Sequence, residues 1–143
     1  MSPTIADLPI FVYGTLMAGE CRAPLWPHPP VRREPAVVQG YLYDLGPHPA
    51  LVDGDDVVAG ELWYLDPAHL TETLRVLDDI EGYHGQEDDW YVREAISCRR
   101  ADGTAQQAYV YRYGHPEQLR HAVRILPDGD GRCRWSAMTR RYG

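Results

Sequence analysis

Residues 10–19 read IFVYGTLMAG, an apolar run that stops at a glycine close to the N-terminus. The apolar side chains at its start predict a short buried strand. Gly14, Thr15 and Leu16, which follow, predict a loop rather than more strand. A glycine-containing turn after a strand can direct successive backbone N–H groups at an anion or an oxyanion. We therefore expect a ligand-binding loop, in which Gly14 provides freedom in φ and a close approach of backbone to ligand.

Length and charge restrict the kind of protein this can be. The chain has 143 residues, the size of one domain. We expect a single domain over residues 1–143, with a core at about 10–113 and a C-terminal helix or tail at 114–143. The formal net charge of −7 argues against a nucleic-acid partner, because phosphate binding needs a concentrated basic face. No apolar run reaches a membrane span and no secretory signal is evident, so we expect a cytoplasmic protein without a membrane partner.

The basic residues narrow the possible mechanisms. All 14 of them are arginine, which excludes a Schiff-base lysine and a P-loop lysine. The arginines near the C-terminus, at positions 132, 134, 140 and 141, predict a solvated tail rather than a binding patch. The three cysteines, at positions 21, 98 and 133, have the spacing of neither a disulfide framework nor a metal motif.

Strand patterns outnumber helix patterns along the chain. Strands are predicted at residues 37–44, 57–65, 90–99 and 105–113, and an Asp-Gly turn joins the last two as a hairpin. Between the first two, glycines and prolines predict a loop with one short extended piece. This composition indicates an α+β protein with a mainly antiparallel, curled sheet.

Two helices and one long loop complete the prediction. The clearer helix covers residues 66–80, with Asp66 as N-cap, Pro67 at the first helical position and an end near Gly82. A weaker helix is predicted at residues 116–125. The proline-rich residues 20–36 predict a surface loop with a short helical turn.

The end of the predicted helix carries an unexpected cluster of acids, Asp78, Asp79 and Glu81. A helix C-terminus is partly negative, so each exposed carboxylate there costs about 0.3–1 kcal/mol. All three side chains can simply point into water. A metal site is a weaker interpretation, because the spacing matches no EF-hand loop and the chain has no His-Glu-x-x-His pattern. A partly buried carboxylate at this position would have a raised pKa and could transfer protons near pH 7.

Three motifs, in this order, resemble the γ-glutamylcyclotransferase-like family, and most closely its small γ-glutamylamine cyclotransferases. They are Tyr13-Gly14-Thr15-Leu16 after a strand, LDDIEGY at residues 77–83, and Tyr91-Val92-Arg93. The segments GYLYDL at 40–45 and VAGELW at 58–63 fall where the family has core strands. The resemblance implies a small mixed, mainly antiparallel β-barrel with flanking helices.

The resemblance also implies a reaction without metal or cofactor. The α-amine of a γ-glutamyl group attacks its own γ-carbonyl, which gives 5-oxoproline and releases an amine or amino acid. Glu81 is then the general base and acid, and Tyr13, Gly14, Thr15 and Leu16 grip the substrate. The loop amides can hold either a substrate carboxylate or the developing oxyanion. The leaving group and the oligomeric state are not predicted.

Several roles have two interpretations. Tyr13 either lends a hydroxyl or belongs to the core, and Arg93 pairs either with a substrate carboxylate or with a structural partner. Tyr91, together with Tyr109 and Tyr111, either walls the pocket or forms an aromatic core stripe. None of the six histidines is assigned, and His84 is the first to check. The alternative functions are a non-catalytic ligand-binding or interaction protein on the same fold, and a metal-dependent hydrolase using the acidic cluster.

Overall fold

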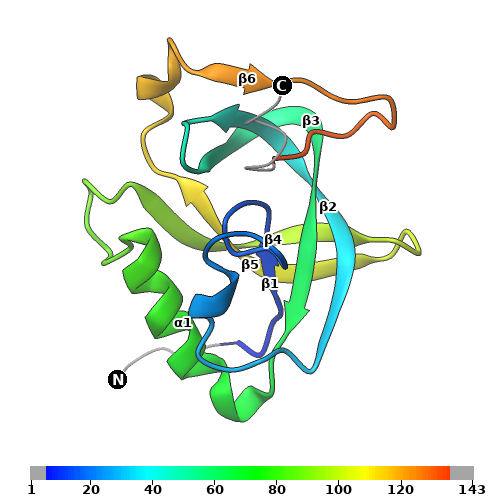
Figure 1. Ribbon diagram of the computed structural model, residues 1–143, viewed down its shortest axis with the longest axis vertical. Coiled ribbons are helices and arrows are strands. Elements are labelled where there is room, and N and C mark those ends of the chain that lie inside the picture. The colour runs from blue at the N-terminus through cyan, green and yellow to red at the C-terminus, as the bar shows by residue number, and fades with distance from the viewer. Residues whose placement is uncertain (1–5, 136–143) are drawn as a thin grey trace.

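The structure, a computed structural model, describes residues 6–135, so Arg140 and Arg141 of the predicted tail lie outside it. It contains one six-stranded sheet in the order β3-β1-β5-β4-β2-β6, and an additional β3–β2 pairing closes the first five strands into a barrel (Figure 1). The only parallel strand pair of the described chain is β1 with β5, which confirms a mixed, mainly antiparallel barrel. The strands are β1 (Ile10–Val12), β2 (Arg32–Asp44), β3 (Pro49–Tyr64), β4 (Tyr91–Arg100), β5 (Ala105–Tyr113) and β6 (Val123–Ile125).

Strands β2 and β3 are longer than predicted. They pair antiparallel from Arg32 opposite Tyr64 to Asp44 opposite Pro49, with one irregularity after Gln39. Both therefore include stretches whose prolines and glycines predict loops. Those predictions were wrong because pairing along a long hairpin outweighs local propensity. The short helical turn predicted in the proline-rich segment is present as a 3₁₀ helix, η1 (Ala23–Leu25).

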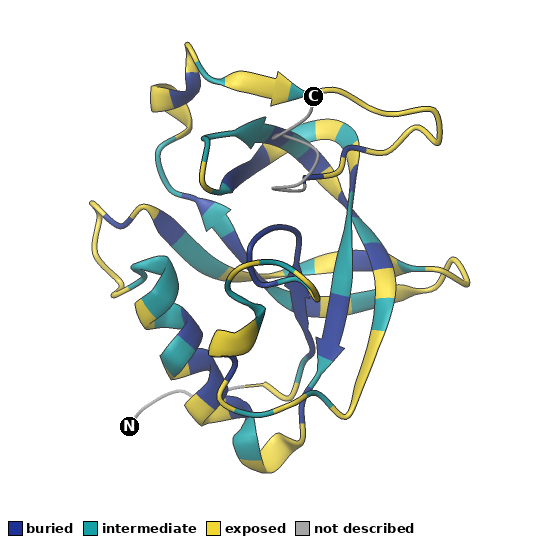
Figure 2. Cartoon of the chain, in the orientation of Figure 1, coloured by how far each residue is buried: buried dark blue, intermediate teal, exposed yellow. Residues whose placement is uncertain are grey.

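Strand β1 is the centre of the barrel wall. It pairs with β3 on one side and with β5 on the other, and all three of its residues are buried. A strand flanked on both edges and covered on both faces needs apolar side chains throughout, which is why its sequence does not alternate. Residues 13–16, the first part of the loop that follows, are buried as well, unlike most loop residues (Figure 2).

The single α-helix of the described chain, α1 (Pro67–Glu81), forms as predicted. The Asp66 side chain accepts a hydrogen bond from the Ala68 N–H at 2.9 Å, and Gly82 ends the helix with φ 72°. Leu70, Leu74 and Leu77 form its buried face and pack into the core cluster that includes β1. No helix within residues 6–135 is long and apolar enough to cross a membrane.

The predicted second helix was wrong. Residues 116–125 instead form a 3₁₀ turn, η2 (Pro116–Leu119), followed by β6, which pairs with Leu42–Asp44 of β2. That edge of β2 is free because β4 pairs with β2 only at Ala36 and Val37. The core also continues past residue 113, since Cys133 and Trp135 are buried while the arginines beside them are exposed.

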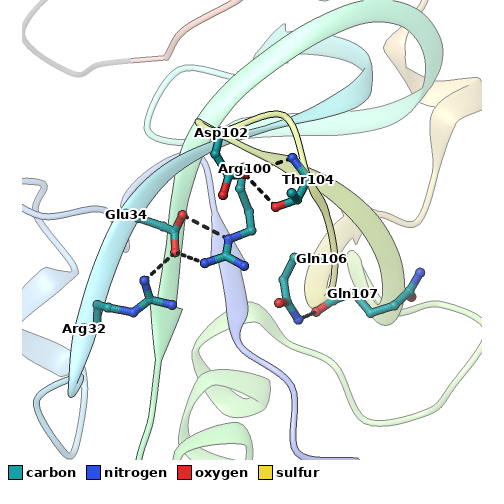
Figure 3. A network of polar contacts seen from close by, with 7 residues as sticks. All are labelled: Arg32, Glu34, Arg100, Asp102, Thr104, Gln106 and Gln107. Carbon is teal, nitrogen blue, oxygen red and sulfur yellow. Dashed lines mark hydrogen bonds and ion pairs between the residues drawn. The ribbon is translucent and has the colours of Figure 1, made fainter.

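Polar contacts reinforce the short seam between β2 and β4. Arg100, at the end of β4, donates to the carboxylate of Glu34 on β2, with an Nε–Oε1 distance of 3.3 Å, and Arg32 pairs with the same carboxylate (Figure 3). Asp102 accepts hydrogen bonds from both the N–H and the hydroxyl of Thr104 in the hairpin turn that follows. The contacts of Glu34 thus add to a seam at which β2 and β4 pair over only two residues each.

A second polar network fastens the end of α1 to the barrel. The Arg93 guanidinium on β4 donates to both carboxylate oxygens of Asp78, at 2.9 and 2.7 Å. The Tyr111 hydroxyl on β5 donates to Asp78 at 2.7 Å. Both Arg93 and Asp78 are about four-fifths buried. One of the three acids at the helix end is therefore compensated by a structural partner.

We expect Arg93→Gln to lower the free energy of unfolding by about 1–3 kcal/mol, because it leaves a partly buried carboxylate without its cation. Urea unfolding at pH 7 measures the change. Arg99→Gln removes the same charge from an exposed position on the same strand and should change stability by at most about 0.5 kcal/mol. Equal effects of the two substitutions would show that the pair with Asp78 does not secure the helix.

Candidate active site

Three segments distant in sequence meet around one cavity. They are the loop after β1, the turn between β2 and β3, and the last residue of α1. Strands β4 and β5 close the remaining side with Tyr91 and Tyr111. Of the predicted site residues, Tyr13, Gly14, Thr15, Leu16, Glu81 and Tyr91 all line this cavity.

Glu81 is the one carboxylate that lines the cavity. It is the last residue of α1 and only partly exposed. Burial raises the pKa of its carboxyl group to about 7, and the positive charge of Arg22 acts in the opposite direction. Near neutral pH this side chain is therefore present both as an acid and as a base, which proton transfer in two directions requires.

The loop after β1 is held through its carbonyl oxygens. Gly14 accepts a hydrogen bond from the Met17 N–H at 3.0 Å, and Thr15 accepts one from the Arg22 N–H at 2.8 Å. The indole of Trp26 donates to the Leu16 carbonyl at 3.0 Å. Within residues 6–135, the N–H groups of Gly14, Thr15 and Leu16 have no acceptor. The loop is thus fixed while its amides remain available to a ligand.

Gly14 is required for a different reason than the one predicted. It is not among the positive-φ glycines of the described chain, so the expectation of unusual backbone freedom was wrong. A Cβ atom at this position would instead lie 2.6 Å from Cγ of Pro49. Glycine allows the ring of Pro49, at the start of β3, to pack directly on the loop. The requirement for glycine at position 14 therefore comes from contact with Pro49 and not from an unusual φ angle.

Of the three tyrosines that line the cavity, Tyr13 and Tyr91 have hydroxyl groups held by backbone carbonyls. The Tyr13 hydroxyl donates to the Tyr111 carbonyl at 2.6 Å, and the Tyr91 hydroxyl donates to the Pro49 carbonyl at 2.6 Å. Burial raises the pKa of both groups, so they stay protonated. Tyr13 therefore belongs both to the core and to the cavity wall. The hydrogen bonds of Tyr13 and Tyr91 fix the positions of both side chains in that wall.

His48 is a cavity residue that the sequence analysis did not identify. Its Nδ1 lies 2.7 Å from the Tyr91 hydroxyl oxygen. The single proton of that hydroxyl points at Pro49, so the imidazole must donate from Nδ1, which leaves Nε2 as an acceptor. Burial and the charge of Arg22 lower the pKa of His48, which favours the neutral ring. No sequence motif marks this histidine, and His84, the first candidate, is exposed and does not line the cavity.

The remaining candidates lie elsewhere. Arg93 does not line the cavity, because its guanidinium pairs with Asp78. Tyr109 also lies outside the lining, whereas Tyr111 belongs to it. Within the described residues, no group of three or more His, Cys, Asp or Glu side chains is arranged to hold a metal ion. The three carboxylates at the end of α1 differ in their surroundings. Asp78 pairs with Arg93, Asp79 is exposed and Glu81 lines the cavity.

Comparisons with known proteins agree with this architecture. The family model described as "Gamma-glutamyl cyclotransferase, AIG2-like" matches residues 10–137. The "Gamma-L-glutamyl-butirosin B gamma-glutamyl cyclotransferase" of Niallia circulans is 31% identical over 112 residues, which are 77% of this chain and 69% of that protein. A Vibrio cholerae protein, provisionally named a gamma-glutamylcyclotransferase, is 38% identical over 72 residues. The match spans 50% of this chain and 62% of that protein, just under two thirds of its length.

Solved structures show the same fold. An AIG2-like protein of Mus musculus is 25% identical with a TM-score of 0.62, covering 90% of this chain and 95% of that one. An Arabidopsis thaliana protein is 22% identical with a TM-score of 0.63, covering 99% of this chain and 76% of that one. The family match covers the barrel, the loop after β1 and the end of α1, and the chain belongs to the gamma-glutamyl cyclotransferase, AIG2-like family.

Proposed function

We propose that the protein cyclises a γ-glutamyl amide to 5-oxoproline and releases the amine. The observation that carries the proposal is one shared cavity, lined by Glu81 and by Gly14, Thr15 and Leu16, whose N–H groups have no acceptor among residues 6–135. Such a cavity combines a proton carrier with donors for negative charge.

The first step forms the ring. The α-nitrogen of the substrate is an ammonium ion near neutral pH, and ionised Glu81 removes a proton from it. The freed amine attacks the γ-carbonyl carbon, which lies within reach in the same chain and closes a five-membered ring. A cavity that folds the glutamyl chain raises the effective concentration of the amine.

The second step breaks the amide bond. Attack turns the γ-carbonyl oxygen into an oxyanion, which the amides of the loop can stabilise. Protonated Glu81 then delivers a proton to the leaving nitrogen as the C–N bond breaks. Ionised again, Glu81 removes the second proton from the ring nitrogen, and that proton passes to the released amine, which leaves as an ammonium ion. Over the reaction the attacking nitrogen goes from three protons to one and the leaving nitrogen gains two. The balance is closed without a cofactor, a metal ion or water.

The other residues would act by positioning. Neutral His48 accepts through Nε2, and a substrate ammonium is a suitable donor for that atom. Tyr13 and Tyr91 form the walls that bend the glutamyl chain. Arg93, paired with Asp78, keeps the end of α1 and hence Glu81 against the barrel.

Glu81→Gln should lower the rate of 5-oxoproline release from γ-glutamyl amides at least about 100-fold, because glutamine can neither take nor give the proton. Chromatographic detection of 5-oxoproline with a panel of γ-glutamyl amides measures this. Glu87→Gln, the same change on an exposed side chain outside the cavity, should leave the rate unchanged.

Three outcomes would contradict the proposal. Full activity of Glu81→Gln would remove Glu81 as proton carrier. A wild-type protein that binds γ-glutamyl compounds but converts none of the panel would favour the ligand-binding alternative. Loss of activity on chelation would instead favour metal-dependent hydrolysis.

Glu81→Gln should also stabilise the fold at alkaline pH. The folded protein raises the pKa of Glu81 from 4.5 to about 7, so its contribution to stability is complete below pH 4.5 and is lost as the pH rises through 7. Urea unfolding should therefore show the variant more stable than wild type at pH 8, by at most about 3 kcal/mol, and equal to it at pH 4. A gain of the same size at both pH values would mean that charge burial is not its cause.

A further inference from the structure

A wider groove continues from the cavity. The two share Glu81, His48 and Tyr91. In the proposed reaction Glu81 must reach the leaving nitrogen, while the loop side of the cavity holds the glutamyl end. The rest of the leaving amine therefore extends into the groove, whose other walls include Leu45, Ile80, Trp90, Tyr113 and Arg22.

The backbone of Arg22 is fixed to the substrate loop. Its N–H donates to the Thr15 carbonyl at 2.8 Å, and its carbonyl accepts from the Leu25 N–H at 3.0 Å. Four residues on, Trp26 donates to the Leu16 carbonyl and stacks on Trp63 with ring centroids 4.1 Å apart. The backbone of Arg22 is thus held in a defined position beside the loop, although the segment around it is rich in prolines.

The guanidinium of Arg22 has no ion-pair partner within residues 6–135. Arg93 and Arg100, by contrast, both pair with carboxylates. Arg22 is only partly exposed. Its charge helps to lower the pKa of His48 and opposes the rise that burial causes in the pKa values of Glu81 and Tyr91. A half-buried cation that acts on three groups of the site is suited to an anion that arrives with the ligand.

The groove is otherwise unfavourable for an anion, because Asp79 and Glu81 also line it. A carboxylate on the leaving amine would be stable there only in contact with Arg22, which can bind it at two points. The apolar walls suit the remainder of such an amine, and the indole of Trp90 is 54% exposed. The glutamyl carboxylate is a poorer partner for Arg22, since Arg22 is absent from the lining of the inner cavity.

We propose that Arg22 is a specificity-determining residue that binds a carboxylate of the leaving amine, so that γ-glutamyl amides of carboxylate-bearing amines are preferred over those of neutral amines. This inference rests on the proposed function. The selectivity then resides in the groove, and the charge of the Arg22 guanidinium produces it.

The test compares two substrates that differ only in that carboxylate, γ-L-glutamyl-L-phenylalanine and γ-L-glutamyl-2-phenylethylamine. Both keep the glutamyl carboxylate. At pH 8.5, above the pKa of Glu81, wild type should show a kcat/KM about 10- to 100-fold higher for the first. Arg22→Gln should bring that ratio to about 1 by loss on the first substrate alone, and Arg22→Lys should retain part of it.

Arg99→Gln removes the same charge at the β4–β5 hairpin and should keep the wild-type ratio. A wild-type ratio near 1, or equal losses on both substrates in Arg22→Gln, would overturn the inference and leave the proposed function intact. Conversion of neither substrate by wild type, together with none of the wider panel, would overturn both. Circular dichroism of each variant establishes that the ratios refer to folded protein.

Discussion

The C-terminal end of α1 brings three carboxylates to the place where the helix dipole opposes them. Asp78 is neutralised by Arg93 and by the Tyr111 hydroxyl, and Asp79 lies exposed. Glu81 is neither paired with a cation, among the described residues, nor fully exposed to water, and burial raises the pKa of its carboxyl group to about 7. The helix can hold this third carboxylate in place because the first is anchored to the barrel. The other residues of the site line the same cavity as this carboxyl group with its raised pKa.

The barrel contributes rigidity where the chemistry needs it. Pro49 packs on Gly14, and its carbonyl accepts the Tyr91 hydroxyl, so the β2–β3 turn and the loop after β1 are fixed to one another. The hydroxyl of Tyr13 is similarly bound to β5. Among the residues that the structure describes, the groups at the cavity without a hydrogen-bond partner include the amides of Gly14, Thr15 and Leu16, Nε2 of His48 and the carboxyl group of Glu81. Preorganisation of this kind spares a site the cost of reorienting its dipoles during the reaction.

Much of this arrangement could be predicted from the sequence because it is encoded locally. The caps of α1, the Asp-Gly hairpin and the apolar run of β1 are each specified within a few residues, and the family motifs predicted which segments converge. The misses share a different cause. Strand β6 and the extended ends of β2 and β3 depend on a free edge and on long-range pairing, which local propensity does not report. Similarly, His48 and Arg22 reach the site through the fold, and neither lies in a motif.

The hydrogen bond between the Tyr13 hydroxyl and the Tyr111 carbonyl joins positions 98 residues apart in the chain. Contacts this distant in sequence are costly to form early, because the intervening loop must close first. During synthesis, the loop after β1 leaves the ribosome long before β5, the strand that braces it. Strand β3 can pair with β1 earlier, but the other edge of β1 stays open and the cavity lacks the wall formed by Tyr111 until β5 joins the sheet.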